Sequence, residues 1–303
     1  MVMNLWLILL IGIHTFSVTL KKFVFEDFAM GVIFRITLYT ETREKAENVA
    51  RKAFERVKYL DSCFSDYQEE SEINRLSKSP SGENIPISQD LFDILKESQN
   101  LFSQSEGVFD VSLGRLTKIW REAVKTGIIP EEDALKKASS FTGFKNILLD
   151  NLNPQVTLIR DGIHLDLGGI AKGYAAEEAG KIIEENGVPY FLIDASGDLY
   201  AGDYPENNPG WQIMTEENDI LFLKNQAIAT SGDTYRGSHI IDPRTGYPTS
   251  IRKKVTVWGK NGSTADALAT ILSIIEEEEV PKFMNIYYPE YHYKIYHLPL
   301  KEN

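Results

Sequence analysis

The chain has 303 residues, of which 43% are hydrophobic and 25% are charged, so it can bury a core of ordinary globular size. A formal net charge of −12 argues against nucleic-acid binding, because phosphate backbones are held by clustered lysine and arginine. A single cysteine, Cys63, excludes an intrachain disulfide framework and any zinc or iron–sulfur site built from cysteines alone.

The N-terminal residues differ from the rest of the chain. Residues 4–20 carry no charge, and the apolar run 5–13 has the length of a signal-peptide core, which is short for a membrane-spanning helix. We therefore expect residues 1–20 to be a signal peptide or an N-terminal membrane anchor, with a buried N-terminal strand as the alternative. Such a chain would be exported, to the periplasm or to the outer face of the inner membrane. No cysteine follows the run, so its own cysteine does not make it a lipoprotein.

Two strands and a series of helices are expected in the first half. Apolar and polar residues alternate over 33–39, which predicts strands on both sides of a break at Met30-Gly31. Ser71 and Ser88 are suited to cap helix N-termini, and Pro130 suits a first helical turn. Helical periodicity predicts a short helix after Ser71 and longer ones over 41–60, 88–107, 116–127 and 130–143.

The second half mixes strands with helices. Close strand pairs separated by turn residues favour an α+β fold over a doubly wound parallel sheet. The expected strands are 145–150, 156–160, 163–167, 189–194, 197–201, 211–215, 220–223, 226–230 and 253–258, with a helix over 170–186 and a β-rich tail at 284–298.

A glycine pair at 168–169 joins a predicted strand to a predicted helix. Glycines there let the backbone approach a ligand closely, and a helix N-terminus offers free N–H groups to an anion. Lys172 lies in the first helical turn, where a cation opposes the helix dipole unless an anion is close. The alternative is a tight strand-to-helix junction with a surface lysine.

A glycine-punctuated loop at 227–248 gathers ionisable and hydroxyl groups between apolar strands. His239 is a candidate catalytic base, although a single histidine is often structural, and the D-P-R-T-G sequence that follows is typical of an ordinary turn. The polar side chains of this loop are Ser231, Asp233, Tyr235, Arg236, His239, Asp242 and Arg244.

The helix expected from residue 262 carries a carboxylate and a hydroxyl on one face. Asp266 and Thr270 are four residues apart, beside the buried stripe of Leu268, Ile271 and Leu272. Ser263 or Thr264 could cap this helix, so Asp266 is not needed as a cap. The pair suits a hard cation such as Mg²⁺, and the alternative is a favourable dipole interaction combined with packing.

Together these stretches resemble the ApbE family, the FAD:protein FMN transferases. The resemblance implies a two-lobed α+β fold of mixed sheets and helices with a central FAD cleft, an ApbE-like flavin transferase domain over 21–303. The matching segments, in the family's order, are 29–31, 63–76, 107–120, 166–175, 194–203, 229–236, 239–248 and 265–270.

The resemblance implies binding positions residue by residue. FAD, as the substrate, is expected to contact Met30, Tyr67, Val108, Phe109, Asp110, Asp166, Lys172 and Ile240. One or two Mg²⁺ ions are expected at Gly169, Asp266 and Thr270, together with the Ala269 carbonyl. One departure from the family pattern is Ser196, which stands where the family commonly has glycine.

The reaction implied by the resemblance transfers FMN from FAD to a threonine or serine hydroxyl of a target protein and releases AMP. The expected target is a redox-complex subunit with a threonine-containing motif. Lys172 would add positive charge, and His239 would take the hydroxyl proton, with Asp242 as the rival base. The alternatives are a Mg²⁺-dependent FAD pyrophosphatase and a flavin-binding protein without catalysis.

Overall fold

The computed structural model describes residues 19–205, 208–215, 217–232, 240–249 and 253–297. The predicted signal peptide or anchor lies almost entirely outside these ranges. Within them, no helix is both long and apolar enough to cross a membrane.

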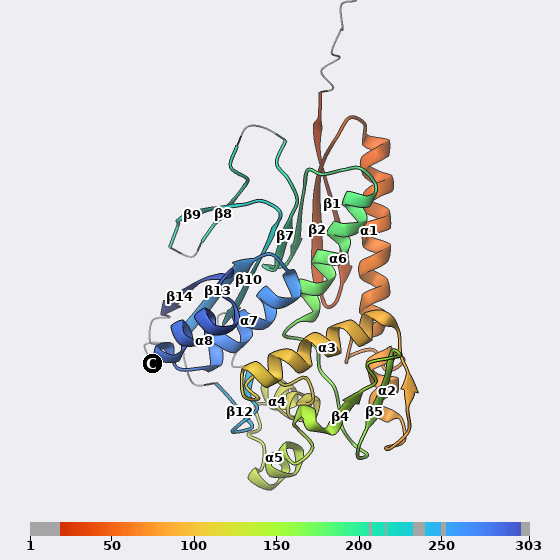
Figure 1. Ribbon diagram of the computed structural model, residues 1–303, viewed down its shortest axis with the longest axis vertical. Coiled ribbons are helices and arrows are strands. Elements are labelled where there is room, and N and C mark those ends of the chain that lie inside the picture. Colours follow the sequence, from red (N-terminus) through yellow and green to blue (C-terminus); the bar gives the residue numbers. More distant parts are fainter. Residues whose placement is uncertain (1–18, 206–207, 216, 233–239, 250–252, 298–303) are drawn as a thin grey trace, which may run out of the picture.

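A seven-stranded antiparallel sheet organises the molecule (Figure 1). Its outer pair, β1 and β2, meets at Met30 and Gly31, whose φ angles of 51° and 73° suit a two-residue hairpin turn. In spatial order the strands are β1 (Lys21–Ala29), β2 (Val32–Thr40), β6 (Phe191–Ala195), β7 (Leu199–Ala201), β10 (Gln226–Gly232), β13 (Lys253–Gly259) and β14 (His292–His297).

Three helices pack against this sheet. Helix α1 (Arg43–Phe64) contacts β1 and β2, α6 (Ala171–Glu185) contacts β6 and β7, and α7 (Gly262–Ile274) contacts β10 and β13. The alternation predicted for β2 is confirmed, since Phe34, Ile36 and Leu38 are fully buried in the main core. Each such side chain contributes roughly 1.5–3 kcal/mol by leaving water.

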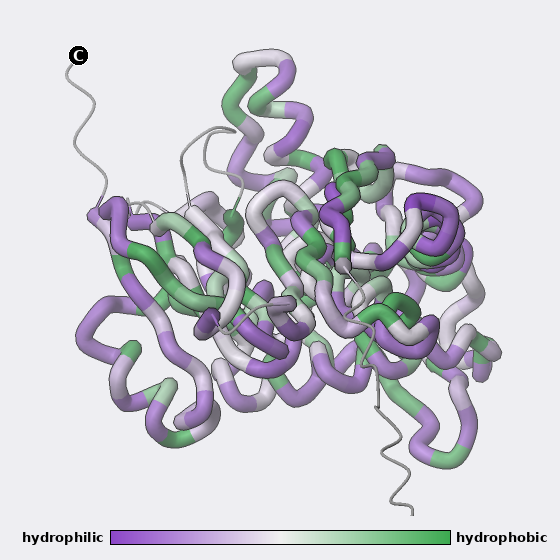
Figure 2. The backbone as a smooth tube through the Cα atoms, turned by 90° about the horizontal axis from the view of Figure 1, so that it is seen from above, coloured by the Kyte–Doolittle hydropathy of each residue, from purple (hydrophilic) through white to green (hydrophobic). Residues whose placement is uncertain are grey.

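Residues 72–158 form a smaller region, drawn in the lower part of Figure 1, while the β8–β9 hairpin and α8 lie outside it. Figure 2 shows hydrophobic and hydrophilic residues mixed along the backbone, as expected of elements with one buried side. The remaining helices are α2 (Glu72–Lys78), α3 (Gln89–Gln104), α4 (Gly114–Thr126), α5 (Glu132–Ser139), η1 (Phe144–Asn146), η2 (Glu277–Glu279) and α8 (Val280–Tyr287). The remaining strands are β3 (Ile85–Pro86), β4 (Ile147–Leu149), β5 (Gln155–Leu158), β8 (Trp211–Met214), β9 (Ile220–Leu223), β11 (Ile241–Asp242) and β12 (Tyr247–Pro248).

The predicted caps of α2 and α3 are confirmed. The Ser71 hydroxyl accepts a hydrogen bond from the Asn74 N–H, and the Ser88 hydroxyl accepts one from the Leu91 N–H. Each cap satisfies a backbone donor that the helix cannot satisfy itself, which typically contributes about 1 kcal/mol.

Three expectations for local structure were wrong. Residues 163–167 make only an isolated bridge between His164 and Leu113, because this segment runs beside the residues that lead into α4 and not in a sheet. Residues 284–287 are helical, as the end of α8, so the β-rich tail is limited to β14. Pro130 precedes α5, whose N-cap is Glu131. The α+β fold class itself is confirmed, since helices pack on antiparallel sheets.

Candidate functional site

The first turns of α6 and α7 cross at two glycines. A Cβ atom on Gly173 would lie 2.1 Å from the Gly262 carbonyl oxygen, and one on Gly262 would lie 2.2 Å from the Gly173 carbonyl oxygen. Neither position can carry a side chain without moving a backbone. The absence of both side chains therefore brings the two helix N-termini together.

Each helix supplies a carboxylate to the N-terminus of the other. Glu177 of α6 accepts the Gly262 N–H at 2.8 Å, and Asp266 of α7 accepts the Gly173 N–H at 3.1 Å. The expected caps of α7 were wrong, since its N-cap is Asn261 without a side-chain hydrogen bond, and Thr264 instead donates to Glu97. Asp266 lies in the second turn of α7, so it serves the dipole of α6 and not that of its own helix.

Asp266 is a buried carboxylate with only 5% of its surface exposed. No ion pair joins it to a cation within the described ranges, and a buried carboxylate without a cation is costly. Thr270 follows one turn later, and a Cβ on Gly169 would lie 3.1 Å from its hydroxyl oxygen. The Thr270 hydroxyl therefore lies against the Gly169 backbone, one helical turn from the Asp266 carboxylate that reaches Gly173.

This donor set fits a hard cation. Carboxylate, hydroxyl and carbonyl oxygens are the ligands that Mg²⁺ accepts, and it retains waters or substrate phosphates at its other positions. The described residues contain no group of three or more His, Cys, Asp or Glu that could hold a metal, so phosphate oxygens would complete the site. The Ala269 carbonyl already accepts the Ser273 hydroxyl at 2.7 Å, which makes it the weakest of the four predicted ligands.

Lys172, in the first turn of α6, forms an ion pair with Asp198. The Asp198 side chain is only 3% exposed and the Lys172 side chain is 30% exposed, so the buried acid holds a cation at the edge of the glycine turn. Sequence reasoning missed Asp198, although it lies within the segment 194–203. In the same segment Ser196 adopts a φ of 59°, a left-handed conformation that favours glycine. This backbone conformation explains why the family commonly has glycine at the position of Ser196.

Three positions predicted to contact FAD, residues 108–110, lie near the Gly168-Gly169 turn. Val108 and Phe109 are buried, and Phe109 lies 3.4 Å from the place of a Cβ on Gly169. The Asp110 carboxylate accepts the Ser112 N–H at 2.9 Å and the Gly143 N–H at 2.8 Å, so it fixes this loop. Burial raises the pKa of Asp110, which these hydrogen bonds oppose.

Asp166 and Tyr67 meet at Arg121 of α4. Arg121 donates to Asp166 at 2.9 Å and also pairs with Asp66, while the Tyr67 ring centroid lies 4.4 Å from its guanidinium carbon. Burial, together with the Asp166 charge, raises the pKa of Asp66 above its ordinary value.

The remaining predicted positions lie on other segments of the chain. Ile240 is buried in the main core, and the partly buried Met30 packs against that core. His239 lies outside the described residues. The Asp242 carboxylate accepts the N–H and side chain of Arg244, which gives it a structural role in the turn between β11 and β12.

Comparison with known proteins decides the family. The model of the ApbE family matches residues 30–293. This chain belongs to the ApbE family. The predicted resemblance is thereby confirmed over most of the chain.

Individual ApbE relatives support this assignment. A FAD:protein FMN transferase of Chlamydia muridarum is 28% identical over 273 residues, covering 86% of each protein. A FAD:protein FMN transferase of Vibrio cholerae is 29% identical over 237 residues, covering 71% of this chain and 70% of the relative. The apo flavinyl transferase ApbE of Pseudomonas stutzeri superposes with a TM-score of 0.82 at 24% identity, covering 93% of both chains, which shows a shared fold.

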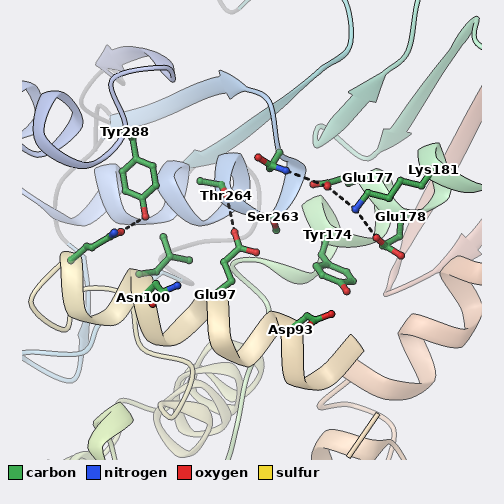
Figure 3. Close-up of a pocket in the computed structure, with 13 residues that line it drawn as sticks. Asp93, Glu97, Asn100, Tyr174, Glu177, Glu178, Lys181, Ser263, Thr264 and Tyr288 are labelled. Atoms are coloured by element: carbon green, nitrogen blue, oxygen red, sulfur yellow. Dashed lines mark hydrogen bonds and ion pairs between the residues drawn. The ribbon is translucent and has the colours of Figure 1, made fainter. Parts of the chain in front are cut away.

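A cavity of about 520 Å³ lies between α3 and the far sides of α6 and α7 (Figure 3). Its lining contains none of the positions predicted to bind FAD or metal. On α7, Thr264 lines the cavity and points to a different side of the helix from Asp266. On α6, Tyr174 lines the cavity and points to a different side from Lys172. Its acids are paired inside the protein: Glu97 accepts from Thr264, and Glu178 pairs with Lys181. The cavity lining therefore does not include Asp266, Thr270 or Gly169.

His164 forms a backbone bridge with Leu113, the N-cap of α4, and its burial predicts that stability falls in acid. Burial, then the charges of Lys118, Arg115 and Lys78, lowers the pKa of His164 to about 4. The unfolded chain binds this proton at a pH near 6.5, so the contribution to stability is complete above that pH and is lost as pH falls toward 4.

Replacing His164 by glutamine should therefore reduce the loss of melting temperature between about pH 7 and pH 4.5. Thermal unfolding of wild type and variant at both pH values measures this difference. His292→Gln, at an exposed histidine, is the control and should lose stability as wild type does. Equal acid sensitivity of His164→Gln and wild type would contradict the assignment.

Proposed function

We propose that this chain is a Mg²⁺-dependent FAD:protein FMN transferase, which moves FMN from FAD to a threonine or serine hydroxyl of a target protein. The observation that carries the proposal is the buried Asp266 carboxylate, which has no ion pair within the described ranges and lies one turn from Thr270, whose hydroxyl lies against Gly169. Membership of a family whose relatives are named FAD:protein FMN transferases supports the same activity.

The reaction needs the diphosphate of FAD to be held and its charge neutralised. The target hydroxyl oxygen forms a bond to the phosphorus of the FMN half, the bridging P–O bond breaks, and AMP leaves with the electron pair. Bound Mg²⁺ would neutralise charge on the phosphate oxygens. Asp266, Thr270 and the Gly169 carbonyl would hold that ion.

Other residues of the chain would orient the substrate and move the proton. The Gly168-Gly169 turn lets the backbone approach the phosphates, and Lys172, held by Asp198, adds a positive charge beside them. We propose His239 as the base that accepts the hydroxyl proton, since an unperturbed imidazole titrates near neutral pH. Asp242 is a weaker candidate because Arg244 engages its carboxylate.

Incubation with FAD, Mg²⁺ and a candidate redox-complex subunit that carries an exposed threonine motif tests this function. Mass spectrometry of the subunit should show covalently added FMN, and AMP should appear in equal amount. AMP and free FMN with an unmodified subunit would indicate a pyrophosphatase and contradict the proposal. Intact FAD would indicate a binding protein and contradict it equally.

We also propose that the chain works outside the cytoplasm, attached to or released from the outer face of the inner membrane. The uncharged apolar run 5–13 supports this location. Separation of periplasmic, membrane and cytoplasmic fractions tests it, and recovery of the full-length chain in the cytoplasm alone would contradict it.

A further inference from the structure

Arg121 occupies a position between three segments that converge on the candidate site. One terminal nitrogen of its guanidinium donates to the Asp166 Oδ2 atom at 2.9 Å, and the other pairs with Asp66. The two aspartate side chains are only 7% and 8% exposed, so the arginine neutralises buried charge. Breaking such a pair on one side leaves a carboxylate without compensation.

The Asp166 carboxylate passes this constraint to the glycine turn. Its Oδ1 atom accepts the Gly168 N–H at 2.8 Å while its Oδ2 atom accepts from Arg121. The orientation of the Asp166 side chain is thus fixed from both sides. Through it, α4 is tied to the backbone that precedes Gly169.

Tyr67 is held by the same guanidinium. The Tyr67 ring lies 4.4 Å from the Arg121 guanidinium carbon, yet 76% of the tyrosine remains exposed. The cation against one side and the large exposed fraction of the residue make the ring a flat platform for a planar aromatic group.

We infer that Arg121 is a positioning residue that orients Tyr67 and the Asp166–Gly168 turn to receive the aromatic and diphosphate parts of FAD. It is not a phosphate ligand itself, because both terminal nitrogens are engaged by carboxylates whose charge repels a phosphate. This inference rests on the proposed function. Arg121 lies one residue beyond the segment 107–120, so the family resemblance did not predict a role for it.

Arg121→Met tests the inference, since methionine keeps much of the side-chain volume and removes the guanidinium. The dissociation constant of FAD, measured by quenching of flavin fluorescence, should rise about 10-fold, and KM for FAD should rise equally. The kcat at saturating FAD should change less than about 3-fold, because Lys172, Asp266 and Thr270, which would act on the phosphates, lie on other helices than Arg121. Loss of kcat with unchanged FAD affinity would overturn the inference.

A double-mutant cycle separates positioning from a general structural effect. Tyr67→Ala should weaken FAD binding comparably, and Arg121→Met with Tyr67→Ala should weaken it little further, because both changes remove the same platform. Fully additive effects on the FAD dissociation constant would show that Arg121 does not act through Tyr67.

Arg115 offers a matched control on the same helix. It stacks on Phe141 at 4.2 Å and donates to the Gly162 carbonyl, away from the candidate site. Arg115→Met should lower thermal stability while leaving FAD affinity unchanged. If both arginine variants weaken FAD binding in proportion to their loss of stability, Arg121 is only structural. If wild type itself binds no FAD, the proposed function fails. If wild type binds FAD and Arg121→Met binds it equally well, only the inference about Arg121 fails.

Discussion

Replacing Asp266 by asparagine is expected to reduce FMN transfer by about 10²–10³-fold or more, with little change in the fold. The asparagine side-chain oxygen can still accept the Gly173 N–H, which Asp266 accepts at 3.1 Å, so the crossing of α6 and α7 is preserved. What is lost is the only negative charge among the predicted metal ligands. Transfer rates measured over a range of Mg²⁺ concentrations should show a large rise in the Mg²⁺ needed for half-maximal activity.

Thr264→Val provides the control for this prediction. Thr264 is on the same helix, but its hydroxyl donates to Glu97 on the side of the cavity beside α3. This variant should transfer FMN at the wild-type rate. Transfer by Asp266→Asn at the wild-type rate and with wild-type Mg²⁺ dependence would contradict the metal assignment.

Replacing Gly173 by alanine is expected to destabilise the protein by about 3 kcal/mol and to abolish most transfer. The added methyl group would lie 2.1 Å from the Gly262 carbonyl oxygen and 2.8 Å from the Asp266 Cβ atom, so α6 and α7 must separate. Because Asp266 and Thr270 lie on α7 and Gly169 precedes α6, separation widens the space for the cation. Urea unfolding measures the free energy, and transfer is measured on the folded fraction.

Gly180→Ala distinguishes lost stability from lost geometry. Gly180 is also in α6, but its added methyl group would meet the Tyr200 ring at 2.5 Å, far along the helix from the glycine crossing. This variant should lose stability while its folded fraction keeps most of the activity. Equal loss of activity per folded molecule in both variants would show that the crossing has no special relation to the site.

Local patterns predicted the elements that local forces determine. Ser71 and Ser88 could be assigned as caps because a serine before an amphipathic run satisfies nearby N–H groups in any context. The strand predicted over residues 163–167 does not form, because an apolar extended segment becomes a strand only when another strand is available to pair with it. Here the Asp166 N–H donates to the Val111 carbonyl, and no ladder forms.

The site was predicted as far as spacing along one helix can predict it. Asp266 and Thr270 are four residues apart, and the structure places both on the side of α7 that faces α6, with Thr270 beside Gly169 and Asp266 beside Gly173. The partners that come from distant segments were missed. Glu177 at the α7 N-terminus, Asp198 at Lys172, and Arg121 between two aspartates are each contacts in space that have no signal in the local sequence.

The central claim is that a divalent cation binds between the glycine turn and the α7 face that carries Asp266 and Thr270. The most direct measurement is anomalous scattering from Mn²⁺ in crystals of the protein grown with FAD. We predict a peak within bonding distance of the Asp266 carboxylate and the Thr270 hydroxyl, in contact with the diphosphate. A peak at the cavity beside α3, or FAD bound with no cation near Asp266, would contradict the account.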